Sequence, residues 1–194
     1  MRKSAAAAVV ALALVSTGCT SMKIDDFQGT QPALTLEDYF EGRTTAWGLF
    51  EDRFGDVRRQ FVVDIDGDWN PQTGVLVLTE DFRYSDGETD QRIWTIRKTG
   101  PNTYEGSAPD VVGTAQGTLA GNAFHWTYTM NLKVGDGTWR VGFDDWMFLQ
   151  PGGVLLNRAS VTKWGIEIGS VSIAFRKDDA AEAAAVTAPR SAAE

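Results

Sequence analysis

Charged residues set among aromatic residues are the first candidates for chemistry in this chain. Glu80 lies in the run "LTEDFRY", and Asp145 lies in "RVGFDDWMF". Two carboxyl groups held in different environments can divide the roles of general acid and general base. Glu80 and Asp145 are therefore the one candidate pair for acid–base catalysis, although the pattern alone gives neither of them a catalytic role.

The chain around Glu80 has the alternation of a β-hairpin. Glu80 and Phe82 would share one strand face, because alternate residues of a strand point the same way. A short loop at 85–87 would then place Arg92 opposite Glu80, with Trp94 beyond it. An isolated buried charge is costly, so Glu80 needs a partner if it points inward, and a guanidinium is a planar, bidentate one.

A second hairpin follows from the two-residue loop 135–136. This loop sets Trp126 opposite Asp145 and Tyr128 opposite Phe143, so that one face is apolar along both strands. A register shifted by one residue would put charged residues and a glycine against the aromatic rings, and we reject it. The predicted register places Asp145 on the same inward face as these rings.

Together the two hairpins predict a mostly apolar pocket with a polar end, which is the usual form of a small-molecule site. The later run "LNRASVTKWG" adds polar candidates, with Lys163 among them. An amphiphile would fit, its head at Arg92 and its tail among the rings. The plainer alternative is that Glu80 and Arg92 only tie neighbouring strands together. The predicted ligand-binding residues are Glu80, Phe82, Arg92, Trp94, Trp126, Tyr128, Phe143, Asp145, Asn157 and Arg158.

The elements that must position these residues are short strands. Residues 34–177 are rich in aromatic and β-branched side chains, with Gly, Asn and Asp at regular intervals, as in an all-β meander. We expect an antiparallel barrel of about eight to ten strands, because closure removes exposed edges. The run "LTLEDYFEG" before the first strand predicts a short helix. The predicted strands are 44–54, 57–69, 74–84, 90–98, 102–108, 111–119, 123–134, 138–149, 154–162 and 166–176.

The N-terminus has the three parts of an export signal: Arg2 and Lys3, an apolar stretch at 5–15, and small residues before Cys19. The apolar stretch is shorter than the roughly 20 residues that cross a bilayer. Small residues directly before a cysteine resemble the lipobox of bacterial lipoproteins, although Ser16 stands where that motif usually has Leu. We therefore predict a lipoprotein signal peptide at residues 1–18; the alternative is a plain secretory peptide with an incidental cysteine.

Lipidation of Cys19 would make the protein a membrane-anchored component of the cell envelope. Several acyl chains give a lasting anchor, at about 0.8 kcal/mol per buried methylene. Thr20 is not the Asp that retains lipoproteins in the inner membrane of Gram-negative bacteria, so we expect the outer membrane, facing the periplasm. As the single cysteine, Cys19 leaves no disulfide to stabilise the domain, which must rely on its core.

Net charge and composition indicate the character of the remaining segments. Removal of Arg2 and Lys3 takes the net charge from −8 to −10, which disfavours nucleic acid as a partner. Residues 19–33 are polar and predict a lipidated tether. Residues 178–194 are Ala-rich and lack the large apolar residues that would bury a core, so we expect a disordered tail. The sequence identifies no protein partner.

Motifs for cofactors and metals are missing from the sequence. There is no Gly-x-Ser-x-Gly elbow, phosphate loop or His/Cys cluster, so we expect neither a cofactor nor a metal. The run 64–70 has acids at alternate positions, as a calcium loop does, but Val75 stands where such a loop needs its glutamate. We interpret this run as a turn after the second strand.

Three runs resemble an uncharacterised family of short bacterial lipoproteins, catalogued as domain of unknown function 3833. The runs are "EDFRYSDGETDQRIW", "GNAFHWTYTM" and "DDWMFLQPGGVLLNRASVTKWGIEIGSVSIAFRK". The resemblance spans about Phe40 to Lys177 and implies a lipid-anchored, calycin-like or lipocalin-like β-barrel with no established activity. It supplies no catalytic residues.

Three functions remain open on this evidence from the residues. The first is a barrel that binds a fatty acyl or other lipid-like molecule. The second is a structural or adaptor lipoprotein whose barrel is a solid core. The third is an enzyme on a lipid-like substrate that uses Glu80 or Asp145.

Overall fold

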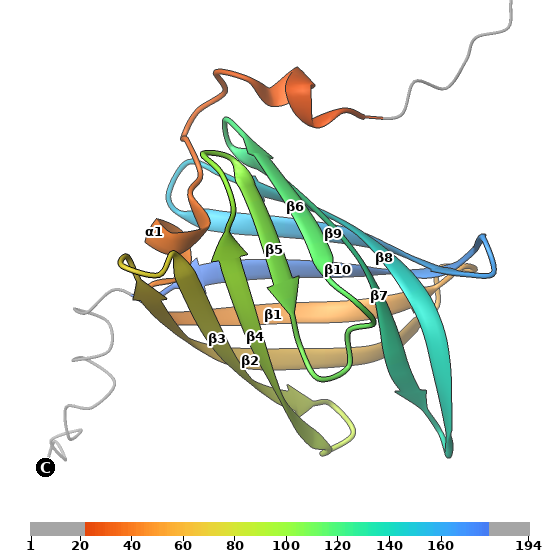
Figure 1. Cartoon of the computed structure of the whole chain (residues 1–194). Helices are drawn as coiled ribbons and strands as arrows, with labels where there is room; N and C mark the ends of the chain where they lie inside the picture. The colour runs from red at the N-terminus through yellow and green to blue at the C-terminus, as the bar shows by residue number, and fades with distance from the viewer. Residues whose placement is uncertain (1–21, 179–194) are drawn as a thin grey trace, which may run out of the picture.

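Ten antiparallel strands form a closed barrel in the computed structural model, which describes residues 22–178 (Figure 1). Each strand pairs with the next along the chain, and β1 closes the barrel against β10. The predicted all-β antiparallel barrel with a short N-terminal helix is confirmed. The elements are η1 (Ile24–Phe27), α1 (Leu36–Phe40), β1 (Gly42–Asp52), β2 (Val57–Asn70), β3 (Val75–Tyr84), β4 (Thr89–Lys98), β5 (Thr103–Ser107), β6 (Ala115–Ala120), β7 (Ala123–Val134), β8 (Gly137–Leu149), β9 (Val154–Lys163) and β10 (Ile166–Lys177).

Three predictions concern residues outside this range. The signal peptide at 1–18, the lipidated Cys19 and the predicted tail at 178–194, apart from Asp178, lie outside the described residues. Among residues 22–178, no helix has the length and apolar composition needed to cross a membrane.

Strand registers follow the alternation read from the sequence. Glu80 pairs with Arg92, and Trp126 pairs with Asp145, as predicted. The expected turn at 64–70 was wrong, because these residues belong to β2. Its aspartates alternate with buried Val63 and Ile65 and therefore face outward, which is what a strand on a barrel wall requires.

The predicted strand at 111–119 starts later than expected. The segment 108–114 leaves β5 and runs beside β7, where the Val112 amide donates to the Thr129 carbonyl at 2.8 Å. The Asn131 amide likewise donates to the Asp110 carbonyl at 2.8 Å. Gly113, at a φ of 78°, makes the turn that ends this detour. As a result Asp110 is held against the barrel wall by β7.

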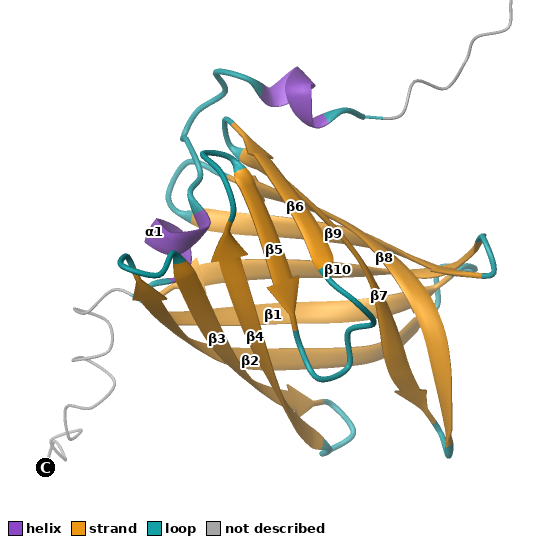
Figure 2. Cartoon of the chain, in the orientation of Figure 1, coloured by secondary structure: helices purple, strands orange, loops and turns teal. Residues whose placement is uncertain are grey.

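One end of the barrel is closed by α1 (Figure 2). Leu36 and Phe40 are buried there, and the Phe40 ring meets the edge of Phe175 at 5.7 Å between centroids. The Tyr39 hydroxyl donates to the Phe175 carbonyl at 3.0 Å. The Tyr104 hydroxyl donates to Glu37 at 2.9 Å, which ties the helix to β5. The opposite end carries the β1–β2, β3–β4, β7–β8 and β9–β10 turns.

The described part of the predicted tether, residues 22–33, packs against the barrel. The Phe27 ring lies 5.3 Å from that of Phe148, between centroids. The Thr30 hydroxyl hydrogen-bonds the Asn122 side chain at 2.7 Å. These contacts fall at the same end as α1, because Asn122 lies in the β6–β7 turn and Phe148 near the end of β8.

Glycines on the inner face make room for aromatic rings. A Cβ at Gly117 would lie 2.4 Å from Trp126 and 2.5 Å from Phe124. One at Gly106 would lie 2.6 Å from Trp126. The short strands β5 and β6 therefore bring their backbones against a tryptophan that a side chain would displace. The ten strands enclose this core among themselves, so residues 34–178 contain a complete barrel core.

We predict that Gly117→Ala lowers the free energy of unfolding by about 1–3 kcal/mol, the usual cost of overpacking a rigid core. Gly137→Ala is the control, because its Cβ would meet nothing closer than 3.7 Å. Urea unfolding measures both changes. Equal stability of the two variants would contradict the packing described for Trp126.

Candidate functional site

A cavity of about 520 Å³ lies inside the barrel, running from α1 to the open end. Leu36 and Phe40 form its floor. The wall made by β1, β2, β9 and β10 is largely apolar, with Ala46, Val63 and Ile173 among its residues. The other wall, made by β3, β4, β7 and β8, carries the inner charged groups, whereas Arg58 and Arg59 of β2 lie toward the mouth.

Most predicted site residues meet in this cavity, from strands far apart in the sequence. Arg158 does not, and its predicted placement was wrong: it is exposed on β9, while its neighbour Asn157 is buried. Adjacent strand residues face opposite sides, so the two could not both line the cavity. The predicted residues that line it are Glu80, Phe82, Arg92, Trp94, Trp126, Tyr128, Phe143, Asp145 and Asn157.

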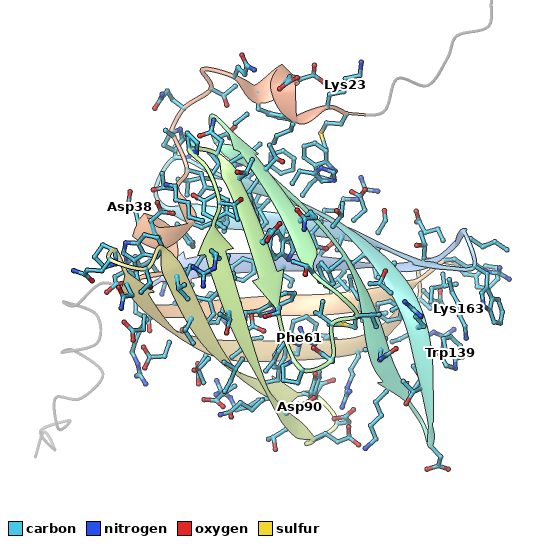
Figure 3. The ribbon with its side chains drawn as sticks, viewed as in Figure 1. Lys23, Asp38, Phe61, Asp90, Trp139 and Lys163 are labelled. Carbon is cyan, nitrogen blue, oxygen red and sulfur yellow. The ribbon has the colours of Figure 1, made fainter. Side chains whose placement is uncertain are left out.

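Lys163 also lies away from the cavity, at the open end of the barrel beside Trp139 (Figure 3). Its ammonium nitrogen sits 3.4 Å from the centre of the Trp139 ring. The rim there exposes further apolar side chains, with Trp164 88% and Phe54 76% exposed. Lys163 thus belongs to an aromatic rim rather than to the polar end of the pocket.

An ion-pair cluster occupies the polar wall. Arg92 Nη1 lies 3.8 Å from Glu80 Oε2, and Arg92 Nε donates to Asp110 Oδ2 at 3.1 Å. The Tyr128 hydroxyl donates to Asp145 Oδ2 at 3.0 Å. Among the described residues, one oxygen on each of the three carboxyl groups has no hydrogen-bond partner: Glu80 Oε2, Asp110 Oδ1 and Asp145 Oδ1.

Stacked rings hold Tyr128 in place. Its ring is parallel to that of Phe143, at 4.9 Å between centroids, and meets Trp94 edge to face at 5.4 Å. Trp94 in turn contacts Trp126 at 5.8 Å. These packed rings fix the tyrosine hydroxyl, and through it the Asp145 carboxyl group.

Asp110 and Arg59 were missed by reasoning from the sequence. Asp110 reaches the cluster from the irregular 108–114 segment, which has no periodicity to reveal its direction. Arg59 lies near the mouth of the cavity, where its Nη2 donates to Asp86 at 3.2 Å and its guanidinium covers the Tyr84 ring at 3.5 Å. The inward alternation of Phe61 and Val63 could have revealed Arg59.

Burial changes the ionisation of the two inner acids. It raises the pKa of Glu80 to about 7, against the opposing effect of Arg92. It also raises the pKa of Asp145 to about 7, although the Tyr128 hydroxyl stabilises the ionised form. Near neutral pH each group can therefore either donate or accept a hydrogen bond. Within residues 22–178, no group of three or more His, Cys, Asp or Glu side chains is arranged to hold a metal ion.

The closed antiparallel barrel and its internal cavity define a lipocalin-like fold. The structure is similar to that of an S-type phycobiliprotein lyase, CPES, from Guillardia theta. The TM-score is 0.55 at 9% sequence identity, over 76% of this chain and 94% of that one. At this identity the similarity concerns the fold alone.

Residues 13–177 match the family model described as protein of unknown function (DUF3833). The chain therefore belongs to this family, as its motifs predicted. A search of curated proteins found no match.

The raised pKa of Asp145 predicts a pH-dependent stability. Because the pKa lies near 7 in the folded protein and at 3.8 ordinarily, the folded state binds the extra proton between these values. The free energy of unfolding must then fall as the pH rises from about 4 to about 7. At pH 8 we expect Asp145→Asn to be more stable than the parent by about 1–3 kcal/mol, with a much smaller difference at pH 4.5.

Urea unfolding at the two pH values measures this effect. Asp81→Asn is the matched control, because Asp81 is exposed on the outer face of β3, where it accepts a hydrogen bond from Gln91. A gain in stability for Asp145→Asn that does not depend on pH would show that Asp145 ionisation is not the cause.

Proposed function

We propose that the protein is a lipid-anchored component of the cell envelope whose barrel binds a hydrophobic or amphiphilic small molecule, fatty acyl or lipid-like in character. The cavity of about 520 Å³ carries this proposal. Its volume falls within the roughly 300–1,000 Å³ of ligand pockets, and apolar walls with a few converging polar groups are their usual lining.

The apolar side chains along the length of the cavity favour an elongated ligand. Apolar side chains line it from Phe40 at the floor to Phe50 and Leu132 toward the mouth. An acyl chain lying along them would remove apolar surface from water at about 25 cal/mol per Å². The fold shared with a protein named a phycobiliprotein lyase supports a cavity-based role without identifying the ligand.

The anchor is proposed from the sequence. Arg2 and Lys3, the apolar stretch at 5–15 and the small residues before Cys19 support export and lipidation. Thr20 after the cysteine supports the outer membrane, on its periplasmic side. The protein would then stay attached to the membrane through Cys19, while the acyl ligand would bind reversibly in the barrel.

The cavity disfavours one of the two other functions and is compatible with the second. A structural or adaptor role with a solid barrel is disfavoured, because the core is hollow. An enzyme on a lipid-like substrate keeps one favourable observation: Glu80 and Asp145 both have pKa values near 7, which suits a general acid or base at neutral pH. Chemical turnover of the bound molecule would distinguish this enzyme from a carrier.

Ligand binding can be measured by tryptophan fluorescence in the chain from Thr20 to Glu194. Trp94 and Trp126 line the cavity, so an acyl chain brominated at its middle should quench them on contact. We expect saturable quenching that persists in Trp164→Phe, since Trp164 is exposed at the rim. Ala159→Leu would fill part of the cavity and should weaken binding at least about tenfold.

The absence of quenching across brominated fatty acids, alcohols and amines would overturn the proposed function. So would quenching that is unchanged in Ala159→Leu, provided that the variant keeps the circular dichroism spectrum of the parent.

Anchoring is tested by Cys19→Ala in the full-length chain. We expect the parent protein to incorporate radiolabelled palmitate and to sediment with membranes. The variant should incorporate none and lose its stable membrane attachment, because the thioether-linked diacylglycerol needs the cysteine sulfur. Labelling of the variant equal to the parent would contradict lipidation at Cys19.

A further inference from the structure

The polar wall of the cavity has more carboxyl groups than cations. The carboxyl groups of Glu80 and Asp145, which line the cavity, and that of Asp110 behind them surround the single guanidinium of Arg92. The Tyr128 hydroxyl has a single proton, which Asp145 Oδ2 already accepts. One oxygen of each carboxyl group is left without a hydrogen-bond partner among the described residues.

These orphaned oxygens are costly in the protein alone. A buried polar atom without a partner destabilises the fold, and the cost is greater when the atom is charged. Asp145 is only 6% exposed, and it lines the cavity together with Glu80. Two of the three unpartnered oxygens therefore belong to carboxyl groups of the cavity wall, beside which a hydrogen-bond donor of the ligand would lie.

The one cation of the polar wall, Arg92, already has carboxylate partners. It is engaged by Glu80 and Asp110, so a carboxylate ligand would have to share one guanidinium with two other carboxyl groups. The remaining basic residues of the lining, Arg59 among them, are toward the mouth, and Arg59 is itself paired with Asp86. An anionic head at the inner polar wall would thus meet like charges, which disfavours it.

We propose that the ligand's inner polar group is a hydrogen-bond donor, either a protonated amine or a set of N–H groups, held by Asp145 together with Glu80. This inference rests on the proposed function and sharpens its ligand class. The acyl or other apolar part lies along the opposite wall of β1, β2, β9 and β10. A fatty acid could enter only with its carboxylate at the mouth.

Proton release should accompany binding of a cation. The groups that face Asp145 are Tyr128 from β7, Glu80 from β3, Arg92 from β4 and the neighbouring Asp144 on β8. Burial raises the pKa of Asp145 and of Glu80 to about 7, against the lowering effect of Arg92. A positive charge beside these carboxyl groups favours their ionised forms, so an alkylamine should bind more tightly at pH 8 than at pH 5.5 and should expel protons at pH 7.

The test compares dodecylamine with dodecanoate, both below their micelle concentrations, by calorimetry on the chain from Thr20 to Glu194. We expect dodecylamine to bind at least about tenfold more tightly at pH 8. Titration in two buffers of different ionisation enthalpy should show protons released at pH 7. Asp145→Asn and Glu80→Gln should each remove most of the preference for the amine.

Asp81→Asn is the control for non-specific attraction of an amine to an acidic protein. It removes one carboxylate from the outer face of β3, and the preference for the amine should survive. An equal loss in all three variants would assign the preference to the surface charge and overturn the inference.

Two other results have separate meanings. Tighter binding of dodecanoate, lost in Arg92→Leu, would overturn the donor preference and leave the proposed lipid-binding function intact. No binding of either probe, with no quenching by the brominated chains, would overturn the proposed function itself.

Discussion

The pairing of β1 with β10 is the interaction on which the rest of the structure depends. It turns a meander of hairpins into a closed wall and separates an inside from an outside. Without it the inner face of every strand would meet water, and the carboxyl groups of Glu80 and Asp145 would titrate as ordinary surface acids. With it, a hydrophobic enclosure surrounds a small set of ionisable groups, and their chemistry differs from that of the surface.

The closed barrel keeps two features that lower its stability and that belong to the candidate site. A barrel of this size could fill its centre with apolar side chains, yet it keeps a cavity beside a cluster of orphaned carboxyl oxygens. Both features lower stability, the first through lost packing and the second through lost hydration. Proteins commonly retain such costs at functional sites. The rigid floor under Phe40 and the stacked rings around Tyr128 supply the order that makes this arrangement persistent.

The local sequence pattern predicted most of the fold and part of the site. Tight turns and period-two alternation predicted the pairs Glu80–Arg92 and Trp126–Asp145, because these signals depend on neighbouring residues only. The same alternation, applied to β9, would have excluded Arg158. Asp110 could not have been found in this way, because its position follows from a tertiary detour along β7. The packing of Phe27 on the barrel likewise has no local signature in a polar segment.

The attachment of η1 has a consequence for how the barrel would stand on a membrane. Even a fully extended chain from Cys19 to Lys23 spans no more than about 14 Å. If Cys19 carries the proposed lipid, the floor closed by α1 would be held near the bilayer, since η1 packs at that end. The mouth would then open away from its own membrane. Cargo would therefore be exchanged with a soluble carrier or an opposing surface rather than with the lipids beneath the barrel.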